Sequence, residues 1–259
     1  MRIATWNVNS VNARLETVLA WVDQGQPDVL CLQEIKCVDE KFPAEPFESR
    51  GYNVLVHGQK SYNGVAILSK FPVSDVRRGL PGDDTDEHAR YLEAVIEGPE
   101  PVRVASIYLP NGNPIGTEKF AFKLAWFERL RRHAAELLKL EERLVLCGDY
   151  NVIPEPADAK RPEAWVGDAL FQPESRAAFR ALTWLGLTDA HELGGEPDGT
   201  FTFWDYQAGA WQRDHGIRID FHLLSPQAAD AFRGIETWRD ARDMDKPSDH
   251  VPVLVTLDP

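Results

Sequence analysis

The sequence predicts an α/β protein with two similar halves, each made of a sheet and helices. The first observation is that an amphipathic helical pattern followed by a buried strand occurs twice, at residues 15–34 and again at residues 120–151. The second is a series of strand-like runs between these two units, without a long helix. The third is composition: 43% of the residues are hydrophobic and 27% are charged, as in globular proteins.

The chain is predicted to form one domain over residues 1–259, because sandwiches and barrels of this length often fold as one unit. No apolar run approaches the roughly 20 residues that span a bilayer, so no membrane association is expected. Residues 1–6 enter a strand pattern at once and show no signal or transit segment, which predicts a cytoplasmic location. Cys31 and Cys147 lie in apolar runs and are expected to be buried free thiols.

The first half begins with a strand at residues 3–8 and a helix at residues 15–22, for which Asn12 is a plausible N-cap and Gly25 a stop. A buried strand at residues 28–34 follows and ends in polar residues. The next four strands are expected at residues 52–56, 64–69, 91–97 and 102–109. Their succession suggests one antiparallel meander.

The second half begins with the longest helix, at residues 118–142, and continues with a buried strand at residues 143–147. Residues 154–174 are polar and rich in proline, which suits a surface loop. Strands at residues 201–204, 219–224 and 251–257 are expected to complete this half.

Several apolar strands end in polar side chains, the pattern of a site built at one edge of a sheet sandwich. These strand ends carry Asn7, Gln33 with Glu34, Tyr108, Asp149 with Asn151, and Asp249 with His250. Carboxylates at rigid strand ends suit a hard cation such as Mg²⁺, which proteins hold by one or two carboxylates. Each residue also has a structural alternative: a turn for Asn7 and Asn9, a solvated strand end for Glu34, and a semi-buried hydroxyl for Tyr108.

Asp220 is the most informative single residue, because it lies inside the apolar run of residues 219–224. A buried carboxylate without a partner is too costly to persist, so a partner is required. Arg218, His222 and His250 are the candidates, and His250 is preferred because an Asp–His pair is a common element of hydrolytic sites. The alternative is a structural pair of Asp220 with Arg218.

The net charge of −13, from 28 basic and 41 acidic residues, argues against a protein that binds DNA mainly by neutralising phosphates. Composition alone favours an enzyme with a small-molecule substrate. Net charge does not fix where charges sit, however, so an acidic pocket that holds a metal and is rimmed by Lys and Arg is compatible with it.

Eight short segments in this order resemble the exonuclease III family of apurinic/apyrimidinic (AP) endonucleases, within the endonuclease/exonuclease/phosphatase superfamily. They are ATWNVNSVNAR (4–14), LCLQEIK (30–36), NGVAILSK (63–70), SIYLPNG (106–112), LCGDYNVIP (146–154), TFTFWDY (200–206), GIRIDFHLLS (216–225) and SDHVPV (248–253). The resemblance spans nearly the whole chain. It implies a four-layer α/β sandwich, in which two mixed, mostly antiparallel sheets pack face to face between flanking helices.

The resemblance also implies a set of roles at the strand ends. Glu34 is expected to be the principal Mg²⁺ ligand, with Mn²⁺ as an alternative ion and one or two ions left open. The residues expected around the metal are Asn7, Glu34, Asp149, Asn151, Asp249 and His250. Asp149 would orient or deprotonate the attacking water, and Asn151 would bind the phosphate. The Asp220–His250 pair would clamp the phosphoryl oxygen, and Tyr108 would support the phosphate or the leaving group.

The implied substrate is double-stranded DNA with abasic sites or blocked 3′ ends. The enzyme would cut the backbone 5′ to the lesion or remove nucleotides or blocking groups from the 3′ end. It is expected to act as a monomer. The residues expected to contact DNA are Lys36, Arg90, Asn111, Phe203, Trp204 and Ile217. The family holds a flipped-out abasic sugar in a small apolar pocket, to which Phe203, Trp204, Ile217 and Ile219 would contribute. Further phosphate contacts are expected from Arg161, Arg213 and Lys246. For Trp204 and Ile219 a core position is the alternative. Some members carry Asp where this chain has Asn9, and the family varies at residues 157–172.

Two other functions stay open on the sequence alone. One keeps the phosphodiesterase chemistry but changes the substrate to undamaged DNA, a phospholipid or an inositol phosphate. The other is a DNA-binding or scaffold protein without catalytic activity, which would be expected to have lost some of the central polar residues. None of them is missing here.

Overall fold

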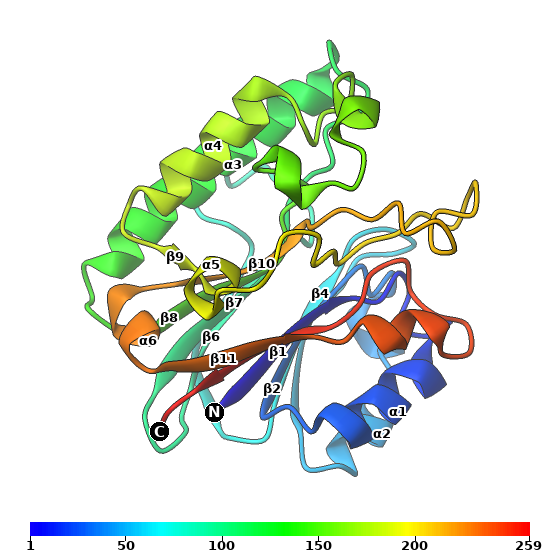
Figure 1. The fold of residues 1–259 in the computed structure, drawn as a ribbon. Helices are drawn as coiled ribbons and strands as arrows, with labels where there is room; N and C mark the ends of the chain where they lie inside the picture. The colour runs from blue at the N-terminus through cyan, green and yellow to red at the C-terminus, as the bar shows by residue number, and fades with distance from the viewer.

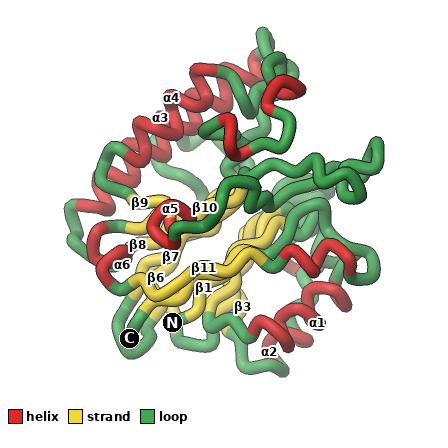
Figure 2. The backbone as a smooth tube through the Cα atoms, in the orientation of Figure 1, coloured by secondary structure: helices red, strands yellow, loops and turns green.

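The computed structural model describes residues 1–259 as two six-stranded sheets packed face to face, with helices on both outer faces (Figure 1). The strands form the two inner layers, and the helices lie outside them (Figure 2). The predicted four-layer α/β sandwich is therefore confirmed. No helix is long and apolar enough to cross a membrane.

The first sheet contains both ends of the chain. Its strand order is β11 (Phe232–Thr237), β12 (Val253–Leu257), β1 (Arg2–Asn7), β2 (Val29–Gln33), β4 (Val65–Ser69) and β3 (Asn53–His57). Only β1 and β2 run parallel; the other neighbours are antiparallel. The outer face of this sheet is covered by α1 (Leu15–Gly25), α2 (Glu45–Glu48), η1 (Asp39–Lys41) and η4 (Arg239–Asp243).

The second sheet repeats this plan. Its strand order is β5 (Val73–Arg78), β6 (Tyr91–Ile96), β7 (Val102–Tyr108), β8 (Leu144–Asp149), β10 (Asp220–Leu224) and β9 (Thr188–Asp189), and again one pair, β7 and β8, is parallel. Its outer face carries α3 (Glu118–Leu138) and α4 (Pro173–Thr183). The shorter elements are α5 (Ala190–Gly194), α6 (Pro226–Asp230), η2 (Pro156–Asp158) and η3 (Pro162–Trp165).

The middle of the sandwich is an apolar layer to which both sheets contribute. Ile3 and Cys31 of the first sheet pack there with Val104 and Cys147 of the second. Alternate residues of these strands face the outer helices instead, so both faces are covered and the strands read as continuous apolar runs. Cys31, Cys37 and Cys147 are buried free thiols, as expected for the two strand cysteines.

Three strand predictions are wrong in their pairing. The four successive strands do not form one meander, because β3 and β4 belong to the first sheet and β6 and β7 to the second. The last strand, β12, does not complete the second half but pairs with β1 in the first sheet. Residues 201–204 form only isolated bridges, at Phe203 with Ile217 and His250. Sheet membership depends on long-range pairing, which periodicity within one strand does not encode.

The predicted N-cap of α1, Asn12, is wrong, because Arg14 occupies that position; the helix ends at Gly25 as predicted, and Gln26 (φ 44°) follows it in a left-handed conformation. The long helix ends at Leu138, four residues before its predicted end. Residues 154–174 contain two short 3₁₀ helices, and α4 already begins at Pro173. The edge strand β5 was not predicted, since its residues are mostly exposed and polar and show no apolar alternation.

Candidate active site

The fold brings the polar strand ends of both sheets to one place. In the parallel pair β1–β2, Asn7 lies beside Gln33, so Glu34 follows at the same edge. In the second sheet Asp149 lies beside Tyr108 on one side and beside Asp220 on the other. Because the carboxyl ends of parallel strands meet at one edge, the two edges together form a single cluster of polar side chains.

Asn7 connects the two sheets within this cluster. Its fully buried side-chain Nδ2 donates to Glu34 Oε1 at 2.9 Å and to Asp149 Oδ2 at 3.0 Å. Its Oδ1 accepts the backbone N–H of Asn9 at 3.0 Å, which fixes the amide orientation. Two carboxylates from different sheets therefore converge on one amide nitrogen.

Glu34 lies on the segment after β2 in a left-handed backbone conformation, with φ at 50°. Burial raises the pKa of Glu34, but hydrogen bonds from Asn7 and Lys36 outweigh it and hold that pKa below its usual value. Lys36 Nζ lies 2.8 Å from Glu34 Oε2 and donates to Asn9 Oδ1 at 2.6 Å. Asn9 in turn donates to Asp249 Oδ1 at 3.2 Å, so this amide joins the outer part of the site.

The predicted partner of Asp220 is confirmed. His250 Nδ1 lies 2.9 Å from Asp220 Oδ2, and both side chains are buried. The alternative pair with Arg218 is wrong, because Arg218 instead binds Asp158 and Asp189 at 2.6 Å each. The other ring nitrogen of His250, Nε2, lies 3.7 Å from Asp149 Oδ2 and so faces the centre of the cluster.

The pKa values of both Asp149 and His250 are raised, and that of His250 is the higher of the two. Burial raises the pKa of Asp149 to about 7, and the nearby Asp220 adds to this, while His250 opposes it. Burial lowers the pKa of His250, but the carboxylates of Asp220 and Asp149 outweigh it and raise that pKa to about 10. A carboxylate that titrates near neutral pH therefore lies beside an imidazolium.

Asn151 extends the site from the loop after β8. Its Oδ1 accepts from Asn111 Nδ2 at 3.1 Å, and its Nδ2 donates to the carbonyl of Leu109 at 3.0 Å. The backbone N–H of Asn151 donates to Asp149 Oδ1 at 2.9 Å. The buried Lys123 of α3 donates to the backbone carbonyls of both Asn111 and Asn151. We did not identify Lys123 from the sequence, although a lysine on the apolar stripe of a helix is a detectable signal.

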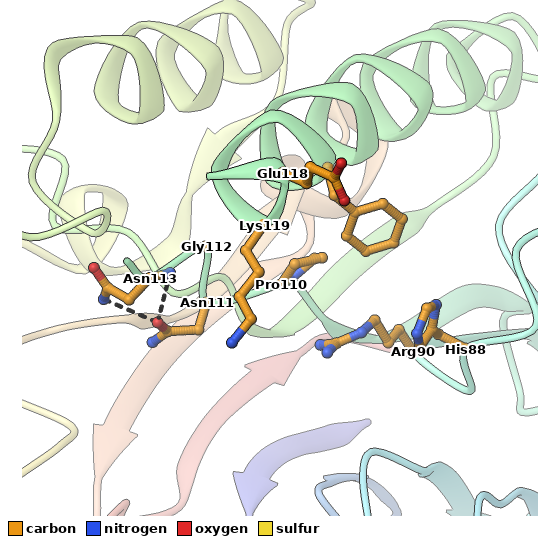
Figure 3. A pocket seen from close by; sticks show the side chains of 9 residues that line it. His88, Arg90, Pro110, Asn111, Gly112, Asn113, Glu118 and Lys119 are labelled. Carbon is orange, nitrogen blue, oxygen red and sulfur yellow. Dashed lines mark hydrogen bonds between the residues drawn. The ribbon is translucent and has the colours of Figure 1, made fainter. Parts of the chain in front are cut away.

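A cavity of about 560 Å³ adjoins this part of the site (Figure 3). Arg90 and Lys119 point into it beside Asn111, and neither has a carboxylate partner, while Glu118 points away from them. Arg90 also stacks its guanidinium 4.6 Å from the centre of the Tyr108 ring. Burial raises the pKa of Tyr108 well above its usual value, and the nearby Glu34 adds to this, so the phenol keeps its proton.

Of the residues expected to form a sugar pocket, Phe203 reaches the site. Its ring packs edge-on against His250 with 4.9 Å between centroids, and it lines a second cavity of about 370 Å³ with Trp165. Ile217 and Ile219 are 1% and 2% exposed in a small apolar cluster with Phe203, so their expected contacts with DNA and its sugar are wrong. Trp204 is fully buried in the core of the first sheet, so its expected contact with DNA is wrong for this conformation.

The three further basic residues lie outside the central cluster. Arg161 lines the cavity beside Phe203 and pairs with Glu163 at 3.0 Å. Arg213 and Lys246 are exposed. A contact of these two with DNA stays a prediction.

The oxygen donors of the cluster fit a hard divalent cation. Glu34 and Asp149 each present one carboxylate oxygen to the same point, now filled by the amide of Asn7. No three His, Cys, Asp or Glu side chains form a complete metal site. An ion would therefore be held by one or two carboxylates plus amide, water or substrate oxygens, which is the way Mg²⁺ is commonly bound.

The family model for the endonuclease/exonuclease/phosphatase family matches residues 4–250. The chain belongs to this family. Within it, exodeoxyribonuclease III of Haemophilus influenzae is 33% identical over 262 residues, which is 98% of each chain. The resemblance of the present chain to the exonuclease III group is thus confirmed, and the present chain is a nuclease.

Solved structures of the endonuclease/exonuclease/phosphatase family share its architecture. An AP endonuclease from Archaeoglobus fulgidus is 36% identical, covers 100% of both chains and superposes with a TM-score of 0.94. A 3′ phosphatase from Neisseria, bound to a product DNA hairpin, is 37% identical, covers 100% of this chain and 99% of its own, and also gives 0.94.

Proposed function

We propose that this nuclease is a Mg²⁺-dependent DNA repair phosphodiesterase that cuts the backbone 5′ to abasic sites and removes nucleotides or blocking groups from 3′ ends. The observation that carries this is the arrangement of Asp149 beside His250, with His250 held by Asp220. It places a base that titrates near neutral pH next to a cationic hydrogen-bond donor.

In the proposed reaction, Asp149 accepts the proton of the attacking water. His250 donates from Nε2 to a phosphoryl oxygen, and Asp220 keeps the imidazole charged and oriented through Nδ1. The amides of Asn151 and Asn111 bind the same phosphate, and the protonated Tyr108 stabilises the phosphate or the leaving oxygen. The P–O3′ bond on the 5′ side of an abasic site breaks, which leaves a 3′-hydroxyl and a 5′-deoxyribose phosphate.

Glu34 would hold the metal, with Asn7, Asp149, Asn151, Asp249 and His250 as the other candidate neighbours. When bound, Mg²⁺ or Mn²⁺ would neutralise charge on the phosphoryl oxygens. Hydrogen bonds from Asn7 and Lys36 hold the pKa of Glu34 below its usual value, so this carboxylate is ionised and can bind a cation.

The choice of an abasic substrate is supported by the apolar wall beside His250. A sugar without its base costs the least to turn out of the duplex, and Phe203, which packs against His250 and lines a cavity with Trp165, offers an apolar surface suited to that sugar. The unpaired cations Arg90 and Lys119 beside the phosphate-binding amides favour a polyanionic strand, although the whole chain is acidic.

The test is incubation of a duplex that carries one abasic site and a 5′ label, with Mg²⁺ and with chelator. The expected product is one labelled fragment that ends in a 3′-hydroxyl next to the lesion, absent when chelator is present. Equal cutting of an undamaged duplex, or release of phosphate from an inositol phosphate or phospholipid in place of DNA cleavage, would contradict the proposal.

A further inference from the structure

We propose that Lys123 is a positioning residue for the phosphate-binding amides: it fixes the backbone of the two loops that carry Asn111 and Asn151. The inference rests on the proposed function, because those two amides are taken to bind the scissile phosphate. Lys123 itself does not touch the reacting groups in this account. It acts through the loops.

Lys123 lies in the first half of α3, on the face that packs against the second sheet. Its side chain is 0% exposed. The Nζ donates to the backbone carbonyl of Asn111 at 3.0 Å and also to that of Asn151. One amine nitrogen therefore ties together two loops that follow different strands, β7 and β8.

The side-chain amides depend on this backbone arrangement. Asn111 Nδ2 reaches Asn151 Oδ1 at 3.1 Å, and Asn151 Nδ2 reaches the carbonyl of Leu109 at 3.0 Å. Asn151 also adopts a left-handed backbone conformation, with φ at 45°. Since each amide is held from the opposite loop, a shift of either backbone moves both donors away from the phosphate.

Burial of Lys123 lowers the stability of the fold, yet the structure provides space for its side chain. Burial lowers the pKa of Lys123 to about 7, because a buried amine that makes no ion pair is costly to charge, and an apolar side chain of similar length would avoid that cost. Room for the stem comes from Gly112: a Cβ at this position would lie 2.6 Å from Lys123 Cδ. A buried lysine beside a glycine is explained if two N–H donors are needed between the carbonyls of Asn111 and Asn151.

The first test compares Lys123→Met, which keeps the stem and removes the donors, with Phe127→Leu on the same buried face of α3. Single-turnover cleavage of the abasic duplex should slow by roughly 10- to 100-fold in Lys123→Met, the scale of a small misplacement of catalytic groups. Phe127→Leu should stay close to wild type, although it also perturbs the core. Equal rates for Lys123→Met and wild type would overturn the proposal.

A second pair of variants leaves Lys123 in place. Gly112→Ala pushes its Cβ into the lysine stem, whereas Gly116→Ala imposes a similar left-handed strain with no atom within 4 Å of the new Cβ. Only Gly112→Ala should slow the cleavage step. Equal loss in both variants would mean that backbone strain, and not the displaced lysine, sets the rate.

A double-mutant cycle separates positioning from general destabilisation. In an Asn111→Ala, Asn151→Ala background, Lys123→Met should have little further effect, because it acts through those amides. The same fold-loss in that background as in wild type would overturn the proposal. If the wild-type protein itself leaves abasic DNA intact, the proposed function fails instead, so the two failures are distinguishable.

Discussion

At the scale of single residues, the proposed chemistry requires a carboxylate and an imidazolium side by side near neutral pH. Burial raises the pKa of Asp149, the proposed base, to about 7. The imidazole of His250 stays protonated because Asp220 and Asp149 together outweigh its burial. The pKa shift of His250 has named neighbours as its cause, so a single substitution can test it.

The first prediction concerns the alkaline limb of the pH profile. His250 has a raised pKa, so its charged form is present at low pH and is lost as pH rises through about 10. Asp220→Asn removes the carboxylate on Nδ1, and the alkaline limb of kcat/KM should move down by roughly one pH unit or more.

The matched control makes the same chemical change at an exposed position, Asp230→Asn. Its alkaline limb should coincide with that of wild type. If the limb of Asp220→Asn also coincides with wild type, His250 is not the group that titrates there.

The central polar residues could be found from the sequence, because each follows or interrupts an apolar strand. The Asp220–His250 pair followed from the cost of burying a lone carboxylate. Lys123 and the bridging role of Asn7 could not be derived in the same way, since they depend on which loops and sheets come together. The buried position of Trp204 was weighed only as an alternative, because core and pocket aromatics look alike in a sequence.

At the scale of elements, a buried ion triad holds the segment that leads to the second cavity. Arg218 contacts Asp158 in η2 and Asp189 in β9 at 2.6 Å each, and all three side chains are at least nine-tenths shielded from solvent. Arg218 also precedes Asp220 by two residues. The triad therefore links the loop at residues 154–172 to the strand that carries a catalytic candidate.

The second prediction is that Arg218→Met destabilises the protein strongly. Removing one partner leaves two buried carboxylates uncompensated, and losses of about 3–5 kcal/mol are usual for a broken buried pair. Urea unfolding would measure this. Arg180→Ala, which breaks an exposed pair with Glu155, should change the free energy of unfolding by less than about 1 kcal/mol. Similar small losses in both variants would contradict the assigned role.

The elements show where sequence reasoning reaches its limit. The strands that are buried on both faces, such as β2 and β8, were predicted to within one or two residues at each end. The edge strands β5 and β11 and the two-residue β9 were not predicted, because they lack a continuous apolar run of their own. The partner of β12 also lay outside local reasoning, since β1 is more than 240 residues away in the sequence.

At the scale of the whole molecule, the two sheets share one apolar layer. Ile67 on β4 is fully buried in it and packs with residues of the second sheet such as Leu92 and Val104. If one sheet unfolds, the apolar side chains of the other sheet in this layer become exposed to solvent. The prediction of one domain over residues 1–259 can be tested on this feature.

The third prediction is a single cooperative unfolding transition. Far-UV circular dichroism and tryptophan fluorescence should give the same midpoint, although most tryptophans lie beside the first sheet. Ile67→Ala should lower both midpoints together and reduce the free energy of unfolding by about 2–5 kcal/mol. Two separate transitions, or a shift in only one signal, would mean that the halves unfold independently.

The whole-molecule charge of −13 remains compatible with a DNA substrate because unpaired cations lie next to the site. With so few phosphate contacts, the fourth prediction is a shallow dependence of DNA affinity on salt, with a slope of roughly −2 to −3 in the logarithm of the association constant against log salt. Binding of an abasic duplex in a series of salt concentrations would measure it. A slope near −8 would contradict the prediction and indicate many more phosphate contacts than the cations beside the site supply.

The central claim is that the cluster around Glu34 and His250 hydrolyses the DNA backbone. Its most direct test is single-turnover cleavage of a duplex with one abasic site by wild type, Glu34→Ala and His250→Ala in the presence of Mg²⁺. Each variant should remain folded and lose at least roughly 100-fold in rate, as when an electrostatic stabiliser of the transition state is removed. Cleavage by folded Glu34→Ala and His250→Ala at near the wild-type rate would show that the chemistry lies elsewhere.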